Sequence, residues 1–281
     1  MPRKLIPFAI AYDFDGTLAP GNMQERDFIP AIGMTTKSFW TEVNDLCKKH
    51  QADNILIYMR LMLKKADAAD IAVRKKDIEA YGKSLAFFKG VETWFDRINI
   101  YGKTSGVQVT HYIISSGIRE MVKGSSISKK FKAIFASSFL YDHNGVAQWP
   151  ALALNYTTKT QYLFRINKGN LDVYDHSKIN DFVPKSQRPV PFENMVFIGD
   201  GDTDIPCFRL VKDQGGHSIA VYKPNTRGKK EKAKKILEDG RVNFTAPANY
   251  KEGGELDLIV KALIDKVATD KQLDFLGKKI G

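Results

Sequence analysis

The sequence predicts an α/β fold, with a doubly wound, mainly parallel, Rossmann-like sheet and an inserted helical cap domain. Two observations lead to this prediction. Short apolar runs of strand length alternate with helix-like segments, which is typical of parallel sheets with helices on both faces. After the first strand, residues 23–88 show apolar positions at helical spacing and no strand-like alternation. We therefore expect a catalytic core of residues 1–20 and 88–281 and a helical cap of residues 21–87.

The predicted strands of the core are short apolar runs. They cover residues 8–14, 107–114, 132–136, 194–198 and 218–222. A hairpin turn is expected at 141–146, where Asp, His, Asn and Gly follow one another. Sheets of this class bind ligands beyond the carboxyl ends of their strands. The residues that follow these strands are therefore the candidates for a functional site.

Helices are expected between the strands. They cover residues 91–99, 118–122, 157–166 and 255–267, and the last of these is amphipathic. Three prolines make residues 181–191 a loop. His111 lies inside a predicted strand and is interpreted as a core histidine.

The composition favours a soluble protein with a basic surface. The net charge is +11, from 43 basic and 32 acidic residues. A basic surface attracts phosphorylated ligands and nucleic acid alike. The densest basic run, residues 227–235, has no interleaved aromatics that would stack on bases, and we interpret it as the solvated face of a helix. A small phosphate ester is the expected partner, and nucleic acid is an alternative.

Cysteine content and hydropathy exclude several classes of protein. Cys47 and Cys207 are the only cysteines, which argues against a disulfide framework or a zinc site. No apolar run approaches the roughly 20 residues of a membrane span. We expect no membrane partner and a cytoplasmic location, and the sequence leaves the oligomeric state open.

Two acidic stretches follow predicted strands. Asp13-Phe14-Asp15-Gly16-Thr17 follows the first strand, and Gly199-Asp200-Gly201-Asp202-Thr203-Asp204 follows the fourth. Carboxylates gathered at one edge of a sheet repel one another unless a cation joins them. Because Mg²⁺ prefers oxygen ligands, the two stretches predict a magnesium site and, with it, phosphate chemistry.

The first stretch has the groups needed for covalent catalysis. A carboxylate can attack phosphorus and form an aspartyl phosphate, so Asp13 is the candidate nucleophile. Asp15 lies two residues further along an extended chain and points to the same side. It is the candidate acid that protonates the leaving alcohol and then activates water. Thr17 is expected to donate a hydrogen bond to a phosphoryl oxygen.

These stretches resemble motifs I and IV of the haloacid dehalogenase (HAD) superfamily, and Ile113-Ile114-Ser115-Ser116-Gly117 resembles motif II. The resemblance implies that Asp13 is the nucleophile and that Asp15 is the acid and base. It implies Mg²⁺ binding by Asp13, the Asp15 carbonyl and Asp200, with Asp204 in support. Residues that bind phosphate would be Thr17, Ser115, Ser116 and Lys159.

The lysine of motif III has two candidates. Lys159 opens a predicted helix, as the family's lysine often does, and Lys168 is the alternative. The lysine would screen charge between Asp13 and the phosphate. The aspartate at position 15 is similar to that of the phosphatases and phosphomutases, and unlike the transport ATPases and true dehalogenases.

The insertion resembles the small helical cap of the phosphoserine-phosphatase-like subgroup. Those phosphatases carry an acidic residue soon after motif I, whereas Gly21-Asn22-Met23-Gln24 has none, and Glu25 comes late. Phosphoserine is therefore not the expected substrate. Arg60 and Arg74 are candidates for reading a substrate anion, although both also suit an ordinary exposed surface.

The resulting hypothesis is an Mg²⁺-dependent phosphomonoester hydrolase that acts through an aspartyl phosphate on a small phosphorylated metabolite. The alternatives are a phosphotransferase or phosphomutase, a nucleic-acid end phosphatase, and a basic nucleic-acid-binding protein on the same fold.

Overall fold

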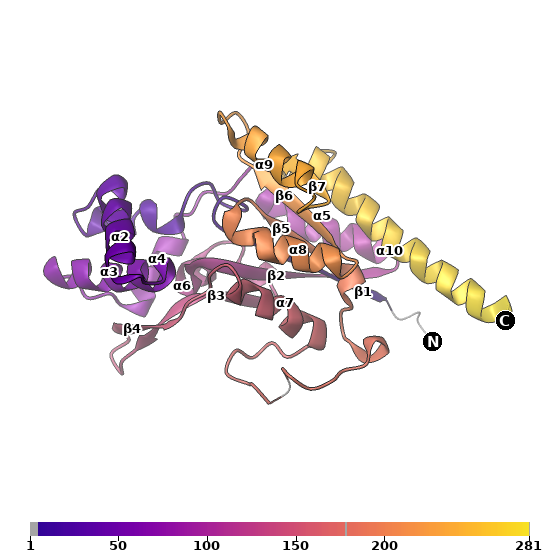
Figure 1. The fold of residues 1–281 in the computed structure, drawn as a ribbon, viewed down its shortest axis with the longest axis horizontal. Coiled ribbons are helices and arrows are strands. Elements are labelled where there is room, and N and C mark those ends of the chain that lie inside the picture. Colours follow the sequence, from indigo (N-terminus) through magenta and orange to yellow (C-terminus); the bar gives the residue numbers. More distant parts are fainter. Residues whose placement is uncertain (1–4, 178, 281) are drawn as a thin grey trace.

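A seven-stranded sheet lies at the centre of the structure, a computed structural model that describes residues 5–177 and 179–280 (Figure 1). The order of the strands is β4-β3-β2-β1-β5-β6-β7. Their bounds are β1 Ile6–Tyr12, β2 Val107–Ile118, β3 Ala133–Tyr141, β4 Ala147–Leu152, β5 Met195–Gly199, β6 His217–Tyr222 and β7 Phe244–Pro247. Every neighbouring pair is parallel except β3 and β4, which form an antiparallel hairpin. The predicted mainly parallel α/β fold is confirmed.

The central strand β1 is buried on both faces. Phe8, Ile10 and Tyr12 belong to one apolar cluster, and Ala9 and Ala11 belong to the other. A strand covered on both sides needs apolar residues at every position, which explains the continuous apolar run in the sequence.

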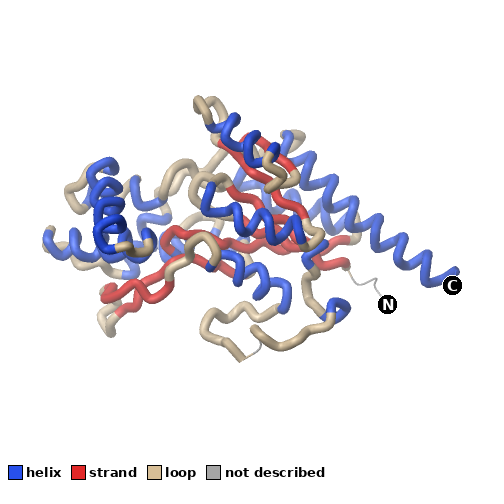
Figure 2. Tube along the Cα trace, in the orientation of Figure 1, coloured by secondary structure: helices blue, strands red, loops and turns tan. Residues whose placement is uncertain are grey.

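Helices cover both faces of the sheet (Figure 2). Helices α5 (Val91–Thr104) and α10 (Glu255–Ile280) pack on the face that includes Phe8. Helices α7 (Thr158–Lys168), α8 (Ile205–Asp213) and α9 (Lys229–Glu238) pack on the opposite face. Short 3-10 turns occur at Met23–Glu25, Ser128–Lys130, Lys185–Gln187, Phe192–Asn194 and Asp202–Asp204.

The insertion between β1 and α5 is helical. It contains α1 (Phe28–Ala31), α2 (Thr36–His50), α3 (Asn54–Ala68) and α4 (Lys75–Gly82). Helices α2–α4 lie together at one end of the molecule, while α10 runs toward the opposite end (Figure 1). Helix α4 packs on α6 (Arg119–Gly124), which follows β2.

Local capping explains where the two long helices of the insertion begin. Thr35 accepts a hydrogen bond from the Ser38 amide at the start of α2, and Asp53 accepts one from the Leu56 amide at the start of α3.

Backbone hydrogen bonds join the insertion to the β3–β4 hairpin. The Lys75 amide donates to the Gly145 carbonyl at 2.9 Å.

Several elements differ from the sequence prediction. Strand β2 continues to Ile118, because its polar Ser-Ser-Gly segment stays extended where the hydrophobic pattern had ended. The edge strand β7 was missed, since it is only four residues long and ends in Pro247. Helix α10 continues to Ile280, beyond the predicted end at Val267. Its last turns expose Leu273 and Phe275, so the burial pattern that marks a helix is absent there.

The described part of the chain contains no helix that is both long enough and apolar enough to cross a membrane.

His111 is a buried core residue, as its sequence context predicted. The Tyr12 hydroxyl lies 3.0 Å from Nδ1, and Asn99 Oδ1 lies 3.0 Å from Nε2. The Trp94 indole also donates to the Tyr12 oxygen at 2.8 Å, so the Tyr12 proton is directed at Nδ1. Burial lowers the pKa of His111 from 6.5 to about 3. His111 is therefore neutral in the folded protein.

We expect this histidine to make the protein less stable as the pH falls below 6.5. Between pH 6.5 and about 3 the unfolded chain binds a proton at His111 that the folded chain does not. The free energy of unfolding should fall by about 1.4 kcal/mol per pH unit from this residue, or about 2 kcal/mol at pH 5. Urea unfolding of the wild type and His111→Gln at pH 7 and pH 5 tests this. An equal pH dependence in the two proteins would contradict it.

Candidate active site

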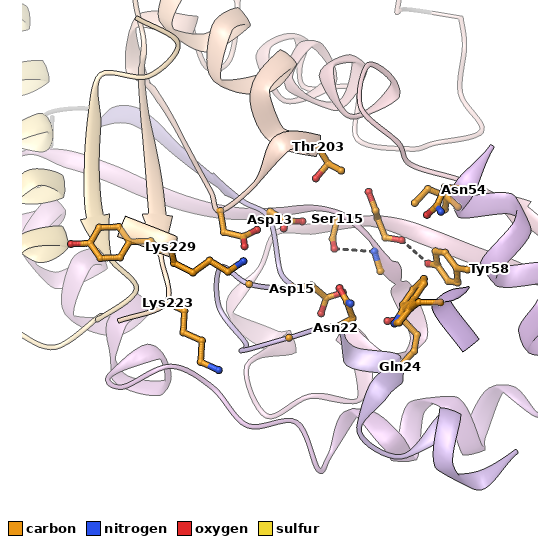
Figure 3. A pocket seen from close by; sticks show the side chains of 18 of the residues that line it. Asp13, Asp15, Asn22, Gln24, Asn54, Tyr58, Ser115, Thr203, Lys223 and Lys229 are labelled. Carbon is orange, nitrogen blue, oxygen red and sulfur yellow. Dashed lines mark hydrogen bonds between the residues drawn. The ribbon is translucent and has the colours of Figure 1, made fainter. Parts of the chain in front are cut away.

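The ends of three neighbouring strands bring the acidic stretches together. Asp13 follows β1, Ser115 lies near the end of β2, and Asp200 follows β5. Because β1 lies between β2 and β5, all three side chains reach one pocket of about 540 Å³ (Figure 3). Asp15 and Lys159 line the same pocket.

Asp13 is joined to a buried lysine. The Lys159 ammonium donates to Asp13 Oδ1 at 3.0 Å and to Asp204 Oδ1 at 2.8 Å. Burial alone would lower the pKa of Lys159, but the two carboxylates outweigh burial and raise it. Burial raises the pKa of Asp13 to about 6; Lys159 opposes this shift and Asp204 adds to it. Lys159 therefore remains a cation and offsets the charge of Asp13.

Asp15 lies in an environment that favours its protonated form. Its Oδ1 accepts a hydrogen bond from the Met23 amide at 3.0 Å. Burial, followed by the charge of Asp13, raises the pKa of Asp15 well above its usual value. The two carboxyl groups of the first stretch thus differ in their surroundings, because the Lys159 ammonium contacts Asp13 and not Asp15. This difference gives the site one candidate nucleophile and one candidate proton donor.

Gly16 allows the first stretch to lie against Asp200. Its φ is +77°, a conformation that strongly favours glycine. A Cβ atom at this position would also collide with the Asp200 carboxylate. The positive φ and the close approach to Asp200 both exclude a side chain at this position. An alanine here would therefore disturb the contact between the two acidic stretches.

Three carboxylates form a cluster suited to a divalent cation. One oxygen each of Asp13, Asp200 and Asp204 lies within 4.8 Å of the others. Burial raises the pKa of Asp200 to about 8, and the charges of Asp13 and Asp204 add to the shift. A bound cation would relieve this repulsion, and the all-oxygen donor set fits Mg²⁺. The cluster could therefore bind a metal.

Asp204 has other partners within this cluster. It is fully buried, and its Oδ2 accepts hydrogen bonds from the amides of Asp200 and Gly201 at 3.1 and 3.3 Å. Its Oδ1 binds Lys159. Asp204 thus holds the second acidic stretch and the lysine in position, and direct metal binding by Asp204 stays a prediction.

The residues predicted to bind phosphate do not all reach the pocket. Ser115 and Ser116 line it, and Ser116 Oγ has no hydrogen-bond partner among the described residues. Ser115 Oγ accepts a hydrogen bond from the Gly117 amide at 3.1 Å. Thr17 is fully buried and does not line the pocket. A hydrogen bond from Thr17 to phosphate is not favoured by this geometry.

The alternative lysine lies elsewhere. Lys168 donates to the carbonyl oxygens of Ile179 and Asp181 at 2.6 and 2.8 Å, in the loop after α7. Of the two candidates for motif III, Lys159 is the one that contacts the acidic cluster.

Comparison with protein families gives the same assignment as the motifs. A family model described as haloacid dehalogenase-like hydrolase matches residues 10–209, a range that includes both acidic stretches, Ser115 and Lys159. This chain is a haloacid dehalogenase-like hydrolase.

The hydrolase is similar to several other proteins. An uncharacterized protein of Borreliella burgdorferi is 32% identical over 275 residues, which cover 88% of this chain and 93% of that one. A HAD family hydrolase from Salmonella enterica subsp. enterica serovar Typhi superposes with a TM-score of 0.57 and 18% identity, over 94% of this chain and 73% of that chain. A phospho-aspartyl intermediate analogue of phosphoserine phosphatase superposes with a TM-score of 0.52 and 18% identity, over 92% and 99% of the two chains.

Sequence reasoning did not identify the residues that the helical insertion of the hydrolase contributes to the wall of the pocket. This wall is formed by Asn22, Gln24, Trp40, Asn54, Ile55 and Tyr58. The Tyr58 hydroxyl reaches the core and donates to the Ser116 carbonyl at 2.7 Å (Figure 3). Arg60 and Arg74 are exposed and do not line this pocket. Helical periodicity identifies a buried face, but not which buried or half-buried residues border a ligand.

The opposite wall includes part of the basic run. Lys229 and Lys232 are exposed on α9, as predicted for a solvated helix face, and they also line the pocket together with Lys223. Lys223 directly follows β6. The strand-end rule that identified Asp13 and Asp200 would also have identified Lys223.

Proposed function

We propose that this hydrolase is an Mg²⁺-dependent phosphomonoester hydrolase that acts through an aspartyl phosphate on a small phosphorylated metabolite. The observation that carries the proposal is the pair of unlike carboxyl groups in one pocket. Asp13 is held by the Lys159 cation, and Asp15 has a strongly raised pKa. Covalent phosphoryl transfer needs both groups. The similarity to a phospho-aspartyl intermediate analogue of phosphoserine phosphatase supports it at the level of the fold.

In the first step, a carboxylate oxygen of Asp13 attacks phosphorus, and the bond from phosphorus to the ester oxygen breaks. The leaving oxygen takes the proton of Asp15 and departs as an alcohol. In the second step, the Asp15 carboxylate takes a proton from water, whose oxygen attacks the phosphorus. The bond to Asp13 then breaks, releasing inorganic phosphate and restoring both carboxyl groups.

The remaining polar groups balance charge and orient the phosphate. Lys159 offsets the negative charge of Asp13 as the phosphate approaches. Ser115 and Ser116 supply hydroxyl groups beside the pocket. Asp13 and Asp200, with the Asp15 carbonyl, would hold Mg²⁺. When bound, the metal supplies positive charge that stabilises the phosphoryl oxygens.

Residues 21–87 are proposed to act as a cap on this site. Tyr58 and Trp40 from this segment line the pocket beside Asp15. Hydrogen bonds from Tyr58 to the Ser116 carbonyl and between Asn155 and Asp53 hold the segment against the core. A cap in this place would exclude water and select the substrate.

Turnover of phosphate esters with and without magnesium tests the proposal directly. The panel contains p-nitrophenyl phosphate and sugar, nucleotide and amino-acid phosphates, each assayed after metal removal and after Mg²⁺ addition. We expect turnover that depends on Mg²⁺. Alcohols added as acceptors distinguish transfer from hydrolysis. Absence of turnover over the whole panel in the presence of Mg²⁺ would overturn the proposal.

Asp15→Asn should slow the reaction in a way that depends on the leaving group. The variant lacks the proton donor, so kcat for alkyl phosphates should fall by about 10²–10⁴-fold. For p-nitrophenyl phosphate, whose leaving group needs little protonation, the loss should be smaller. Measuring kcat over a series of aryl phosphates with increasingly basic phenols tests this. A loss of equal size across the series would argue against the acid role.

A further inference from the structure

The pocket has one basic wall that the proposed reaction does not use. Lys223, from the loop after β6, and Lys229 and Lys232, from α9, line it. Lys232 pairs with Asp202 at 2.7 Å. Among the described residues, Lys223 and Lys229 form no ion pair. Lys229 is close enough to Asp200 for its charge to oppose the rise in the pKa of that carboxyl group. Two ammonium groups that form no ion pair therefore border the space that a substrate would enter.

These lysines lie on the side of the acidic residues opposite to Ser115. In Figure 3, Lys223 and Lys229 lie on one side of Asp13 and Asp15, whereas Ser115 and Tyr58 lie on the other side. The buried Lys159 already offsets the charge of Asp13 through direct contact. The transferred phosphate thus has its own set of groups.

The opposite wall carries no charge. Its polar side chains are the amides of Asn22, Gln24 and Asn54, with the Trp40 and Tyr58 rings beside them. Gln24 Oε1 is buried and has no hydrogen-bond partner among the described residues. Glu25, the acid that follows Gln24 in the sequence, accepts hydrogen bonds from the Trp40 indole at 2.8 Å and from the Asn22 side-chain amide at 2.7 Å. This wall fits an uncharged polar part of a ligand, and it offers no carboxylate to a substrate ammonium.

We propose that the substrate is a phosphate ester with a second anionic group, and that Lys223 and Lys229 bind this second group. The inference rests on the proposed phosphatase function and narrows its substrate class. An ammonium on a flexible stem binds a phosphate or a carboxylate as a point charge. The uncharged centre of the ligand would then lie against the amide and aromatic wall.

Binding to the Asp13→Asn protein tests the inference without depending on turnover. Calorimetric titration compares matched ligands that differ by one anionic group. Fructose 6-phosphate is compared with fructose 1,6-bisphosphate for a second phosphate, and glycerol phosphate with 3-phosphoglycerate for a carboxylate. We expect at least one of the two added groups to tighten binding by about tenfold, since exposed ammonium groups are partly screened by solvent. The arm that shows the gain identifies the second anion.

The decisive variant is Lys223→Gln combined with Lys229→Gln. It should remove the preference for the second anion, so that the ratio of the two dissociation constants approaches one. The matched control combines Lys230→Gln with Lys235→Gln, two exposed lysines of α9 that do not line the pocket. This control changes the net charge equally and should keep the preference.

Three results would overturn the inference. The first is no preference for the second anion in the parent protein, and the second is an unchanged preference in the Lys223 and Lys229 variant. The third is an equal loss in the control variant, which would attribute the effect to overall charge. Absence of any turnover by the wild type contradicts the proposed function instead, and the binding ratios still report on the lysines.

Discussion

Asp13→Asn is expected to lower kcat for p-nitrophenyl phosphate by at least about 10⁴-fold, because removal of a covalent nucleophile abolishes its reaction path. The asparagine amide occupies nearly the same volume, and Lys159 keeps its bond to Asp204. We therefore expect the fold to survive. Initial rates in saturating Mg²⁺, together with circular dichroism and thermal unfolding, provide the measurement.

A matched control for this substitution is available in the second acidic stretch. Asp202 is exposed and pairs only with Lys232 among the described residues. Asp202→Asn removes the same charge close to the site and should change kcat by less than about threefold, as expected for an exposed ion pair. Full activity of Asp13→Asn would overturn the assignment of the nucleophile. Failure to trap labelled phosphate on wild-type protein quenched in acid would count against the covalent intermediate.

Lys159→Met is expected to cause the largest loss of stability. The substitution leaves Asp13 and Asp204 buried without the ammonium that contacts both. Removing one partner from a buried ion pair costs about 3–5 kcal/mol, because the remaining charge has neither water nor a counter-ion. Urea unfolding in the presence of EDTA measures this loss without compensation from bound metal.

Lys168→Met is the control for this second prediction. Lys168 binds two carbonyl oxygens in the loop after α7 and contacts no carboxylate of the acidic cluster. Its replacement should cost about 1 kcal/mol, as for a typical hydrogen bond, and should leave activity largely intact. If Lys168→Met abolished activity and Lys159→Met did not, the choice between the two lysines would be reversed.

The difference between Lys159 and Lys168 illustrates what sequence reasoning could reach. Both residues lie on the predicted helix or directly after it, and a helix pattern does not determine which residue points to the sheet edge. The preference for Lys159 came from the motif resemblance. The ion pair between Lys159 and Asp13 depends on the packing of α7 against β2 and α8, which directs the Lys159 side chain at Asp13.

Thr17 is a residue whose surroundings sequence reasoning did not predict. The spacing of the first stretch suggested that its hydroxyl would reach the phosphate. In the structure Thr17 is fully buried and does not line the pocket, and its backbone carbonyl accepts a hydrogen bond from the Tyr250 hydroxyl at 2.8 Å. Tyr250 is 233 positions away in the sequence, so no local pattern could predict this contact.

The sequence by itself determined the α/β class and the gathering of Asp13, Asp15, Ser115 and Asp200. In a parallel sheet, residues that follow buried apolar runs necessarily meet at one edge, so local patterns and simple topology suffice. Only the tertiary structure decided the walls of the pocket, with Tyr58 on one side and Lys223 and Lys229 on the other. These walls depend on how separate segments pack across the sheet edge, and packing of this kind leaves no periodic signal in the chain.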